Sequence, residues 1–290
     1  MTSATGSPAK AAFPWWLVGF ILLFVILPLA LGIWCAGQIK QPVVGVIKLD
    51  AAIEAYSASD LLTQISYARE HDEIRAVVLV LDSPGGTVAD TEAVYLELLR
   101  LRAKKPVVTV VNSMAASGAY YLSVGTDYIF AKPTSEVGNI GVIGSLPSTP
   151  SIDESTISTG PYKLWGSPRD SYARSIEMVK QGFFQAVKLG RGDALKLTDD
   201  EVVSGKLWLG TEALRNGIVD ELGTQTQAQE KAAQLARISN YTVSDLRKLS
   251  GLPEQVSVSF YYMAPDGTST GLPAEPGLYL LYVPMPEVVK

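Results

Sequence analysis

Short apolar runs rich in β-branched residues alternate along the chain with longer segments of mixed polarity. Three of these runs, at residues 43–49, 76–81 and 106–111, have the length and composition of buried β-strands. The segments 59–71 and 88–103 instead repeat apolar residues at helical spacing. Because strands that alternate with helices of about 10–15 residues build βαβ units, this pattern predicts an α/β fold with a mostly parallel sheet and flanking helices.

The pattern changes twice in the second half of the chain. Between residues 145 and 168 Ser, Thr, Pro and Gly predominate, which is typical of a loop or an extended segment. Helical spacing then returns, and we expect helices at 170–189, 198–204, 211–216 and 224–237. The last part, 252–290, predicts two strands, at 256–262 and 278–283, around a connection rich in Pro and Gly.

A long apolar segment lies near the amino terminus. No charged residue occurs in the 29 positions between Lys10 and Lys40. A helix of about 20 apolar residues is long enough to span a bilayer, and tryptophans stand near both ends of this one, where indole rings favour the membrane interface. We therefore expect residues 13–37 to form a transmembrane anchor behind a polar tail of residues 1–12.

A cleaved signal peptide is the alternative for this segment. The apolar core of a signal peptide runs about 7–15 residues and ends in small residues, whereas this segment is longer and carries Trp34 near its end. A lipid-modified Cys35 is a weaker alternative, because bulky Ile33 and Trp34 precede it. Too few lysines flank the segment for the positive-inside rule to set its orientation.

Composition and charge exclude several classes of function. The net charge of −5 argues against a nucleic-acid partner, because binding to phosphates needs a basic surface. The chain has one cysteine and one histidine, which exclude an intramolecular disulfide and any multi-histidine metal centre. No cofactor is predicted.

Two loops after predicted strands contain residues suited to acyl-transfer chemistry. The sequence SPGG at 83–86 follows one strand, and Ser117 follows another among small residues that leave its hydroxyl accessible. Because both strands are expected to be parallel, both loops open at one edge of the sheet. The N–H groups of Gly86 and Gly118 could then form an oxyanion hole around the Ser117 hydroxyl. Taken singly, each loop also fits a plain structural turn or helix start.

A serine nucleophile needs a base to accept its proton. His71 lies in a charged run at the end of a predicted surface helix, where a solvated structural role is expected, so a Ser–His–Asp triad is not predicted. A lysine base must be neutral, and burial in apolar surroundings lowers its pKa from about 10.4. Lys163 is the candidate because Tyr162, Leu164 and Trp165 flank it; an exposed lysine whose neighbours pack elsewhere fits equally well.

Several motifs resemble one known family when they are taken in order. The chain is similar to the signal peptide peptidase A family of Ser–Lys serine peptidases, which share the Clp protease/crotonase-like fold. The resemblance lies in DSPGG (82–86), SMAASGAYYL (113–122), VGNIGVIG (137–144), STGPYKLWGSPRD (158–170), GRG (190–192) and GKLWLGTEALRNGIVDELG (205–223), together with the single anchor.

The resemblance implies an activity and an assembly. Ser117 would be the nucleophile, Lys163 the base, and Gly86 and Gly118 the oxyanion hole of a peptidase domain spanning 38–238. It also implies a ring-like homo-oligomer whose protomers complete each other's sites, anchored in the cell membrane by a single span with the domain on the extracytoplasmic side. Remnant signal peptides and other extended or unfolded polypeptides would be the substrates.

The sequence departs from the family pattern in a few places. Ala119 stands where a second glycine is common, and Asn139 replaces a usual serine. The linker 145–159 lacks the leucine-rich helical pattern expected before the lysine. The extension 239–290 matches no pattern that we can name, and covering the active site, mediating assembly and binding a partner are all open roles for it.

Two further functions are compatible with these motifs. One is a membrane protease dedicated to a single partner, such as a stomatin-like protein. The other is a catalytically silent crotonase-like scaffold that binds peptides, against which the presence of both Ser117 and Lys163 argues. For the peptidase, we expect a substrate to bind in extended form along a strand edge, with apolar pockets for small or aliphatic side chains.

Overall fold

The computed structural model describes residues 15–38, 41–145, 159, 163, 169–254, 262–263, 269–270 and 277–281. The chain divides into two compact units, Met1–Gln41 and Pro42–Lys290. The predicted anchor falls in the first unit and the predicted α/β domain in the second.

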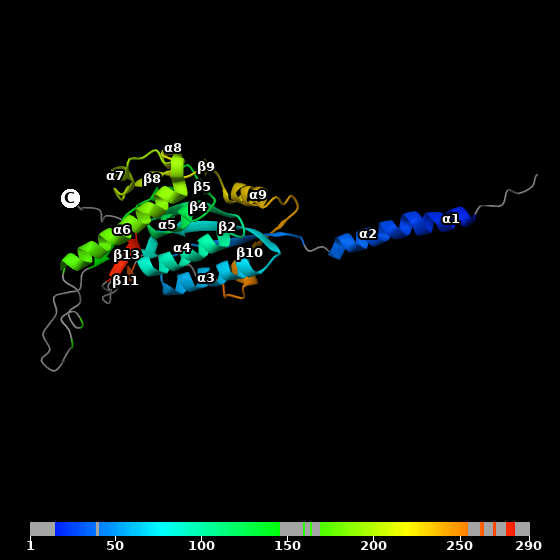
Figure 1. Ribbon diagram of the computed structural model, residues 1–290, viewed down its shortest axis with the longest axis horizontal. Coiled ribbons are helices and arrows are strands. Elements are labelled where there is room, and N and C mark those ends of the chain that lie inside the picture. The colour runs from blue at the N-terminus through cyan, green and yellow to red at the C-terminus, as the bar shows by residue number, and fades with distance from the viewer. Residues whose placement is uncertain are drawn as a thin grey trace, which may run out of the picture. The chain divides into compact units, whose positions relative to one another are not determined.

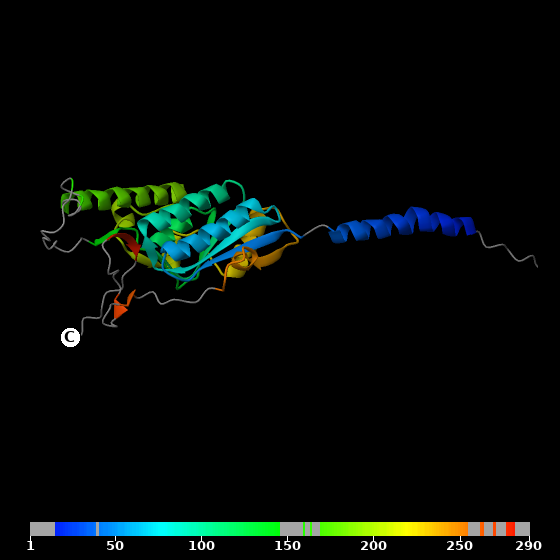
Figure 2. The ribbon, with the colours of Figure 1, turned by 90° about the horizontal axis from the view of Figure 1, so that it is seen from below.

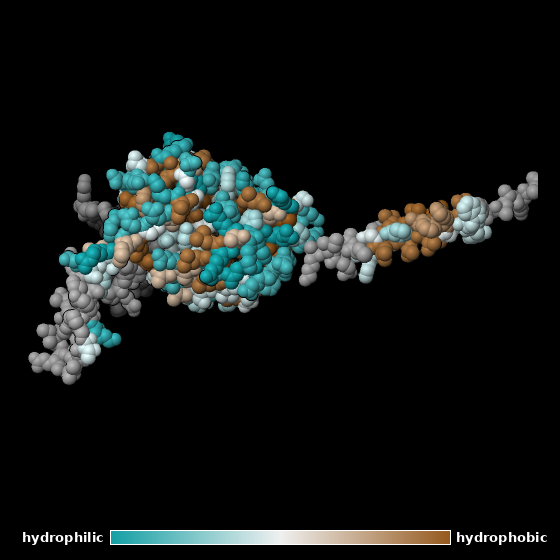
Figure 3. All heavy atoms as spheres, in the orientation of Figure 1, coloured by the Kyte–Doolittle hydropathy of each residue, from teal (hydrophilic) through white to brown (hydrophobic). Residues whose placement is uncertain are grey.

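The first unit contains an apolar helical segment (Figure 1). It consists of α1 (Trp15–Ile21), a π-helical turn (Leu22–Ile26) and α2 (Leu27–Gln38). The turn lies just before Pro28, whose ring displaces the carbonyl of the preceding turn and removes one N–H donor. Within this helix the window Trp15–Gly32 has a mean hydropathy of 2.4 and no buried residue, so it is long and apolar enough to cross a membrane. Its surface is correspondingly hydrophobic (Figure 3).

A mainly parallel sheet forms the centre of the second unit. Its path runs β10-β1-β2-β4-β5-β9, with β6 beside β4 and β8 beside β6. All these pairs are parallel except β6–β8. The strands are β1 (Val43–Leu49), β2 (Ile74–Ser83), β4 (Val107–Ala116), β5 (Tyr128–Ala131), β6 (Glu136–Gly138), β8 (Leu207–Leu209), β9 (Glu221–Leu222) and β10 (Thr242–Asp245). The predicted α/β fold is therefore confirmed.

Helices cover both faces of this sheet (Figures 1 and 2). One face packs against α3 (Ala55–Glu70), α4 (Val88–Arg102), α5 (Gly118–Val124) and α6 (Arg169–Arg191), and the other against α9 (Gln225–Leu235). Smaller helical elements are Gly192–Ala194, α7 (Asp199–Val202), α8 (Gly210–Arg215) and α10 (Leu246–Leu249). Each predicted helix of this unit is observed, with its ends shifted by up to four residues.

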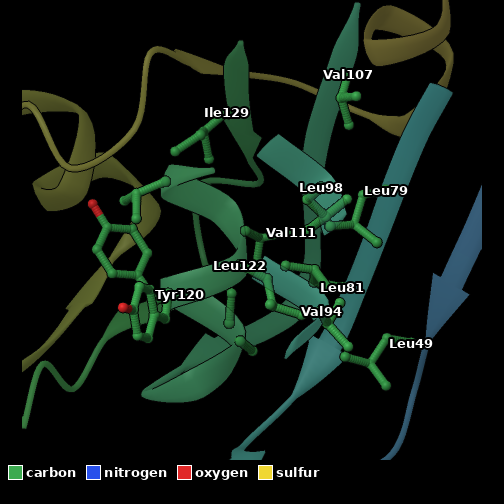
Figure 4. Close-up of a cluster of buried hydrophobic side chains, with 14 of the residues drawn as sticks. Leu49, Leu79, Leu81, Val94, Leu98, Val107, Val111, Tyr120, Leu122 and Ile129 are labelled. Atoms are coloured by element: carbon green, nitrogen blue, oxygen red, sulfur yellow. The ribbon is translucent and has the colours of Figure 1, made fainter. Parts of the chain in front are cut away.

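Side chains on successive strand positions point to opposite faces, which explains the two separate cores. Along β2, Leu79 and Leu81 pack into the larger core with α4, whereas Ala76 and Val78 pack into the smaller one with α9. Figure 4 shows part of the larger core, in which Leu98 of α4 lies among the leucines of the sheet. Burying one such leucine stabilises the fold by about 1.5–3 kcal/mol.

A second, smaller sheet joins three segments that lie far apart in the sequence. It has the order β3-β13-β7, from β3 (Gly85–Thr87), β13 (Gly277–Leu281) and β7 (Ile143–Ser145). The short strands β11 (Tyr262–Met263) and β12 (Ser269–Thr270) pair with each other. A strand is thus observed where 278–283 predicted one. The predicted strand 256–262 lies outside the described residues except at its end, as does most of the predicted loop 145–168.

Candidate active site

Ser117 lies at the sharp turn between β4 and α5. Its backbone has φ 53° and ψ −118°, because the chain changes from strand to helix within this one residue. A non-glycine residue at positive φ costs on the order of 1–3 kcal/mol and persists where its surroundings hold it. Strained strand-to-helix turns of this kind present nucleophilic serines in α/β-hydrolases.

Hydrogen bonds hold the Ser117 backbone on both sides. Its N–H donates to the carbonyl of Gly138 (2.8 Å), and its carbonyl accepts from the N–H of Tyr121 (3.0 Å). The residue is only 1% exposed. The site therefore contains an enclosed serine whose backbone is fixed on both sides.

The first turn of α5 supplies one candidate oxyanion donor. Gly118 is the first residue of this helix, so its N–H has no partner within the helix. The N–H of Ser117 itself is used by Gly138. Of these two amides, that of Gly118 is therefore the candidate donor, and its role in an oxyanion hole stays a prediction.

Gly86 is the second predicted donor, and its place in β3 permits no side chain. A Cβ atom there would lie 1.8 Å from the carbonyl oxygen of Ile53. Ile53 donates to the Gly85 carbonyl (2.7 Å) and accepts from the Thr87 N–H (2.9 Å). Because successive backbone groups of a strand point to opposite sides, the N–H of Gly86 faces away from Ile53.

The two loops meet at one edge of the sheet, as the sequence predicts. Ser83 of β2 is in parallel register with Ala115 of β4, two residues before Ser117. The buried Ser83 hydroxyl accepts a hydrogen bond from the Gly85 N–H (3.2 Å), which stabilises the turn into β3. Parallel pairing thus places the SPGG loop beside the serine loop.

The structure places the two candidate bases differently. Lys163 lies in a turn with an exposed side chain, and its neighbours Tyr162, Leu164 and Trp165 fall outside the described residues. His71 ends α3 with its ring stacked on Tyr67, and it precedes β2. His71 therefore lies near the amino ends of the parallel strands, whereas Ser117 follows the carboxyl end of β4. The predicted structural role of His71 fits this position.

The loop 137–144, to which the sequence assigned no role at the site, supports the serine. Gly138 has φ 121°, and a Cβ there would lie 2.6 Å from Trp208 Cε3. The next residue, Asn139, has φ 53°. Its backbone N–H donates to the Lys206 carbonyl (2.8 Å), and its side-chain amide donates to the Gly205 carbonyl (2.8 Å). Asparagine tolerates this conformation, so it suits the position where the family commonly has serine.

A buried ion pair fixes the end of α6. The Arg191 guanidinium forms a bidentate pair with Asp220 (2.7 and 3.0 Å) and donates to the Gly217 carbonyl (2.8 Å). Burial lowers the pKa of Arg191, but the hydrogen bonds to Asp220 and the charge interactions with Tyr120, Asp220 and Tyr128 together outweigh burial and raise the pKa above its ordinary value. Tyr120 of α5 donates to the nearby Ile218 carbonyl (2.9 Å). The GRG and NGIVDELG motifs are thus joined in one structural network.

Comparisons with known proteins identify the family of this chain. Residues 100–239 match the family model described as Peptidase family S49, and residues 43–137 match the model described as Clp protease. Protease 4 of Salmonella typhi is 32% identical over 73% of this chain and 37% of its own length. A candidate protease of Synechocystis sp. is 30% identical over 64% of this chain and 76% of its own length. The chloroplastic serine protease SPPA of Arabidopsis thaliana is 28% identical over 75% of this chain and 35% of its own length.

A mainly parallel sheet of the Clp protease type, with a serine at a strained strand-to-helix turn, defines the class of this protein. The chain belongs to the signal peptide peptidase A family, peptidase family S49. It spans 29% to 64% of the length of the first curated relatives that it matches.

Proposed function

We propose that the protein is a membrane-anchored serine endopeptidase that uses Ser117 as nucleophile and Lys163 as general base. The single observation that carries the proposal is the geometry of Ser117, an enclosed serine at φ 53° beside an unpaired helix N–H. Because the chain belongs to a family of proteases, we interpret this serine as the nucleophile of a peptidase.

The proposed reaction is acyl transfer to water. Neutral Lys163 accepts the Ser117 proton as Oγ attacks a peptide carbonyl, and the N–H groups of Gly86 and Gly118 stabilise the oxyanion. The lysinium then protonates the leaving amine, and the acyl-enzyme is hydrolysed with the same lysine as base. This role requires Lys163 to leave water, because only a desolvated lysine is neutral near pH 7.

Extended polypeptides are the proposed substrates. The N–H of Gly86 points to the side of β3 on which an extended chain can pair, so a peptide bound there by main-chain pairing brings a carbonyl to it. Recognition through the main chain accepts many sequences, which suits remnant signal peptides and unfolded chains. The apolar helix Trp15–Gly32 supports an anchor that would hold the enzyme near such substrates at a membrane.

The contrast between an enclosed Ser117 and an exposed Lys163 supports a dyad completed between subunits. In the single chain the lysine side chain is exposed in a turn, whereas a base for Ser117 must lie within hydrogen-bonding reach of the serine hydroxyl. We propose that a homo-oligomer buries this turn against the serine of a neighbouring protomer.

Mixing two inactive variants tests both the dyad and its location. Ser117→Ala and Lys163→Ala should each abolish peptide hydrolysis while the thermal unfolding temperature stays near that of the wild type. Ser123→Ala, which alters another buried serine of α5, serves as the matched control and should stay active.

When the two inactive variants are dissociated, mixed and reassembled, a dyad across subunits should restore about a quarter of the wild-type activity, the statistical share of intact interfaces. No recovery would place the dyad within one chain. Full activity of Lys163→Ala alone would refute the lysine base.

A further inference from the structure

A strand of the same chain lies between the edges of β3 and β7, and we call the space between these two edges the groove. This strand is β13, drawn in red in Figure 1, and it runs antiparallel to both β3 and β7. Leu280 is opposite Gly86, and Tyr279 is opposite both Thr87 and Ile143. A segment from the end of the sequence therefore fills the space between two strand edges that come from the first half of the chain.

The pairing direction shows which backbone groups this strand occupies. Since Gly85 and Thr87 are bonded to Ile53, the N–H and carbonyl of Gly86 point toward β13. Leu280 directly opposes Gly86, so the two residues form a hydrogen-bonded pair of the antiparallel ladder. The N–H that is expected to bind a substrate oxyanion thus faces the chain's own C-terminal strand.

A substrate and β13 cannot use this edge at the same time. The space between β3 and β7 accommodates one extended chain, with main-chain pairing on both sides. We propose that Gly277–Leu281 is a built-in occupant of the peptide-binding groove, which a substrate must displace before it reaches Ser117. The inference rests on the proposed function for the use of this groove by substrates, but the occupancy can be tested without turnover.

The sequence of the strand also indicates what the groove accepts. GLYLL is uncharged and contains aliphatic and aromatic residues. Residues 255–276 tether it to the end of the described domain at Glu254. Because this strand and β3 belong to one chain, their pairing is intramolecular and has an effective concentration on the order of millimolar, so even weak pairing competes strongly with a free peptide. Apolar, uncharged extended peptides are therefore the substrates best matched to the groove.

A binding experiment on the full chain separates this proposal from the catalytic one. In a Ser117→Ala background, a fluorescent peptide with the sequence of residues 274–284 is titrated against protein with native Leu280 and against Leu280→Pro. Proline removes the N–H that faces Gly86 and weakens pairing to β3. Tyr262→Pro is the matched control, because β11 pairs only with β12 among the described strands.

We expect the Leu280→Pro protein to bind the peptide at least tenfold more tightly than either of the others. In the Ser117 background the same substitution should lower KM by a similar factor at unchanged kcat. Equal peptide affinity in all three proteins would overturn the proposal. If Leu280→Pro bound the peptide more tightly but the protein with Ser117 hydrolysed no peptide, the proposal that β13 occupies the groove would be upheld and the proposed peptidase activity would be refuted.

A disulfide lock provides a second test that does not depend on a proline. Thr87 and Tyr279 are directly opposite each other. Because the N–H of Thr87 donates to Ile53, the two residues form a non-hydrogen-bonded pair of the antiparallel ladder. The Cα atoms of such a pair are about 4.5 Å apart, which is within the range of a disulfide. Thr87→Cys and Tyr279→Cys are combined with Cys35→Ser, which removes the only native cysteine.

Oxidation should block peptide binding and hydrolysis, and a thiol reductant should restore both at least tenfold. Thr87→Cys alone controls for loss of the α4 cap that Thr87 provides. A crosslinked protein that binds peptide as well as the reduced form would refute the occupant.

Discussion

The backbone N–H of Ser117 donates to the Gly138 carbonyl over 2.8 Å, and this bond links the turn of the proposed nucleophile to the end of β6. The bond uses the amide that would otherwise compete with Gly118 for an oxyanion. It also makes the conformation of Gly138 part of the site, although this residue carries no side chain.

Gly138→Ala should therefore impair both stability and catalysis. Its φ of 121° is accessible almost only to glycine, and the added methyl would meet the Trp208 ring at 2.6 Å. We expect a loss of about 1–3 kcal/mol in the free energy of unfolding, measured by chemical denaturation, and a lower kcat. Gly141→Ala is the control, since nothing lies within 4 Å of its added Cβ. Equal effects of the two substitutions would contradict the role given to Gly138.

Gly86→Ala should reduce turnover by displacing an oxyanion donor. A methyl group at 1.8 Å from the Ile53 carbonyl cannot be accommodated without moving β3. Loss of one such donor costs about 10²–10³ in kcat, which steady-state hydrolysis of a peptide substrate would measure. Gly182→Ala, in an open position of α6, should leave kcat unchanged. If Gly86→Ala kept its kcat, Gly86 would not be part of the oxyanion hole.

Arg191→Ala should be strongly destabilising. The substitution removes the buried, bidentate partner of Asp220, which leaves that carboxylate with the Ile129 N–H donor and the Gly217 carbonyl without the Arg191 donor. Breaking a buried pair in this way costs about 3–5 kcal/mol, and Arg191→Lys should recover little because lysine lacks the planar fork. Lys188→Ala breaks an exposed pair with Asp199 and should cost less than about 1 kcal/mol. Similar unfolding free energies for the two alanine variants would refute the structural network.

Three tyrosines should make the fold sensitive to alkali. Burial raises the pKa of Tyr120, and it raises that of Tyr121 to about 12; burial and the hydrogen bond to Glu221 raise the pKa of Tyr128 to about 12. In each case the folded state holds the proton more tightly than the unfolded state, whose pKa is near 10. Their contribution to stability is thus complete below about pH 10 and is lost as the pH rises toward 12.

The melting temperature should accordingly fall steeply between about pH 10 and 12, as measured by circular dichroism. Tyr128→Phe, which removes one of the three groups, should make the decline shallower. A melting temperature that stays constant through this range would show that the tyrosines titrate alike in both states.

Hydrophobic patterning predicted the central strands well, because a parallel strand buried on both faces is a continuous apolar run. The observed β1 coincides with the predicted 43–49. β4 continues through the polar residues Asn112 and Ser113, which a pattern of hydrophobicity assigns to a loop. Those residues remain in a strand because Ala115 pairs with Ser83 and with Val137. β6 and β8 have three residues each, too few for any periodicity to appear.

The candidate site was predictable as far as it depends on neighbouring parallel strands. Ser83 and Ala115 in register explain why Gly86 and Ser117 could be assigned to one edge from the sequence. The role of the Gly138 carbonyl was not predictable, because every residue type has a backbone carbonyl and the sequence does not show which one accepts a hydrogen bond. The placement of Gly277–Leu281 depends on pairing with partners far away in sequence, and no local signal specifies such partners. Lys163 stays a prediction, because its pocket would come from contacts that its own neighbours in sequence do not define.

The near-complete enclosure of Ser117 has a practical consequence. With 1% of its surface accessible, the residue can react with a small acylating reagent only during those moments when the surrounding loops part. The rate at which such a reagent inactivates the protein would therefore measure how often these loops open. At saturating reagent concentration it would report the frequency of opening and no longer the nucleophilicity of the oxygen.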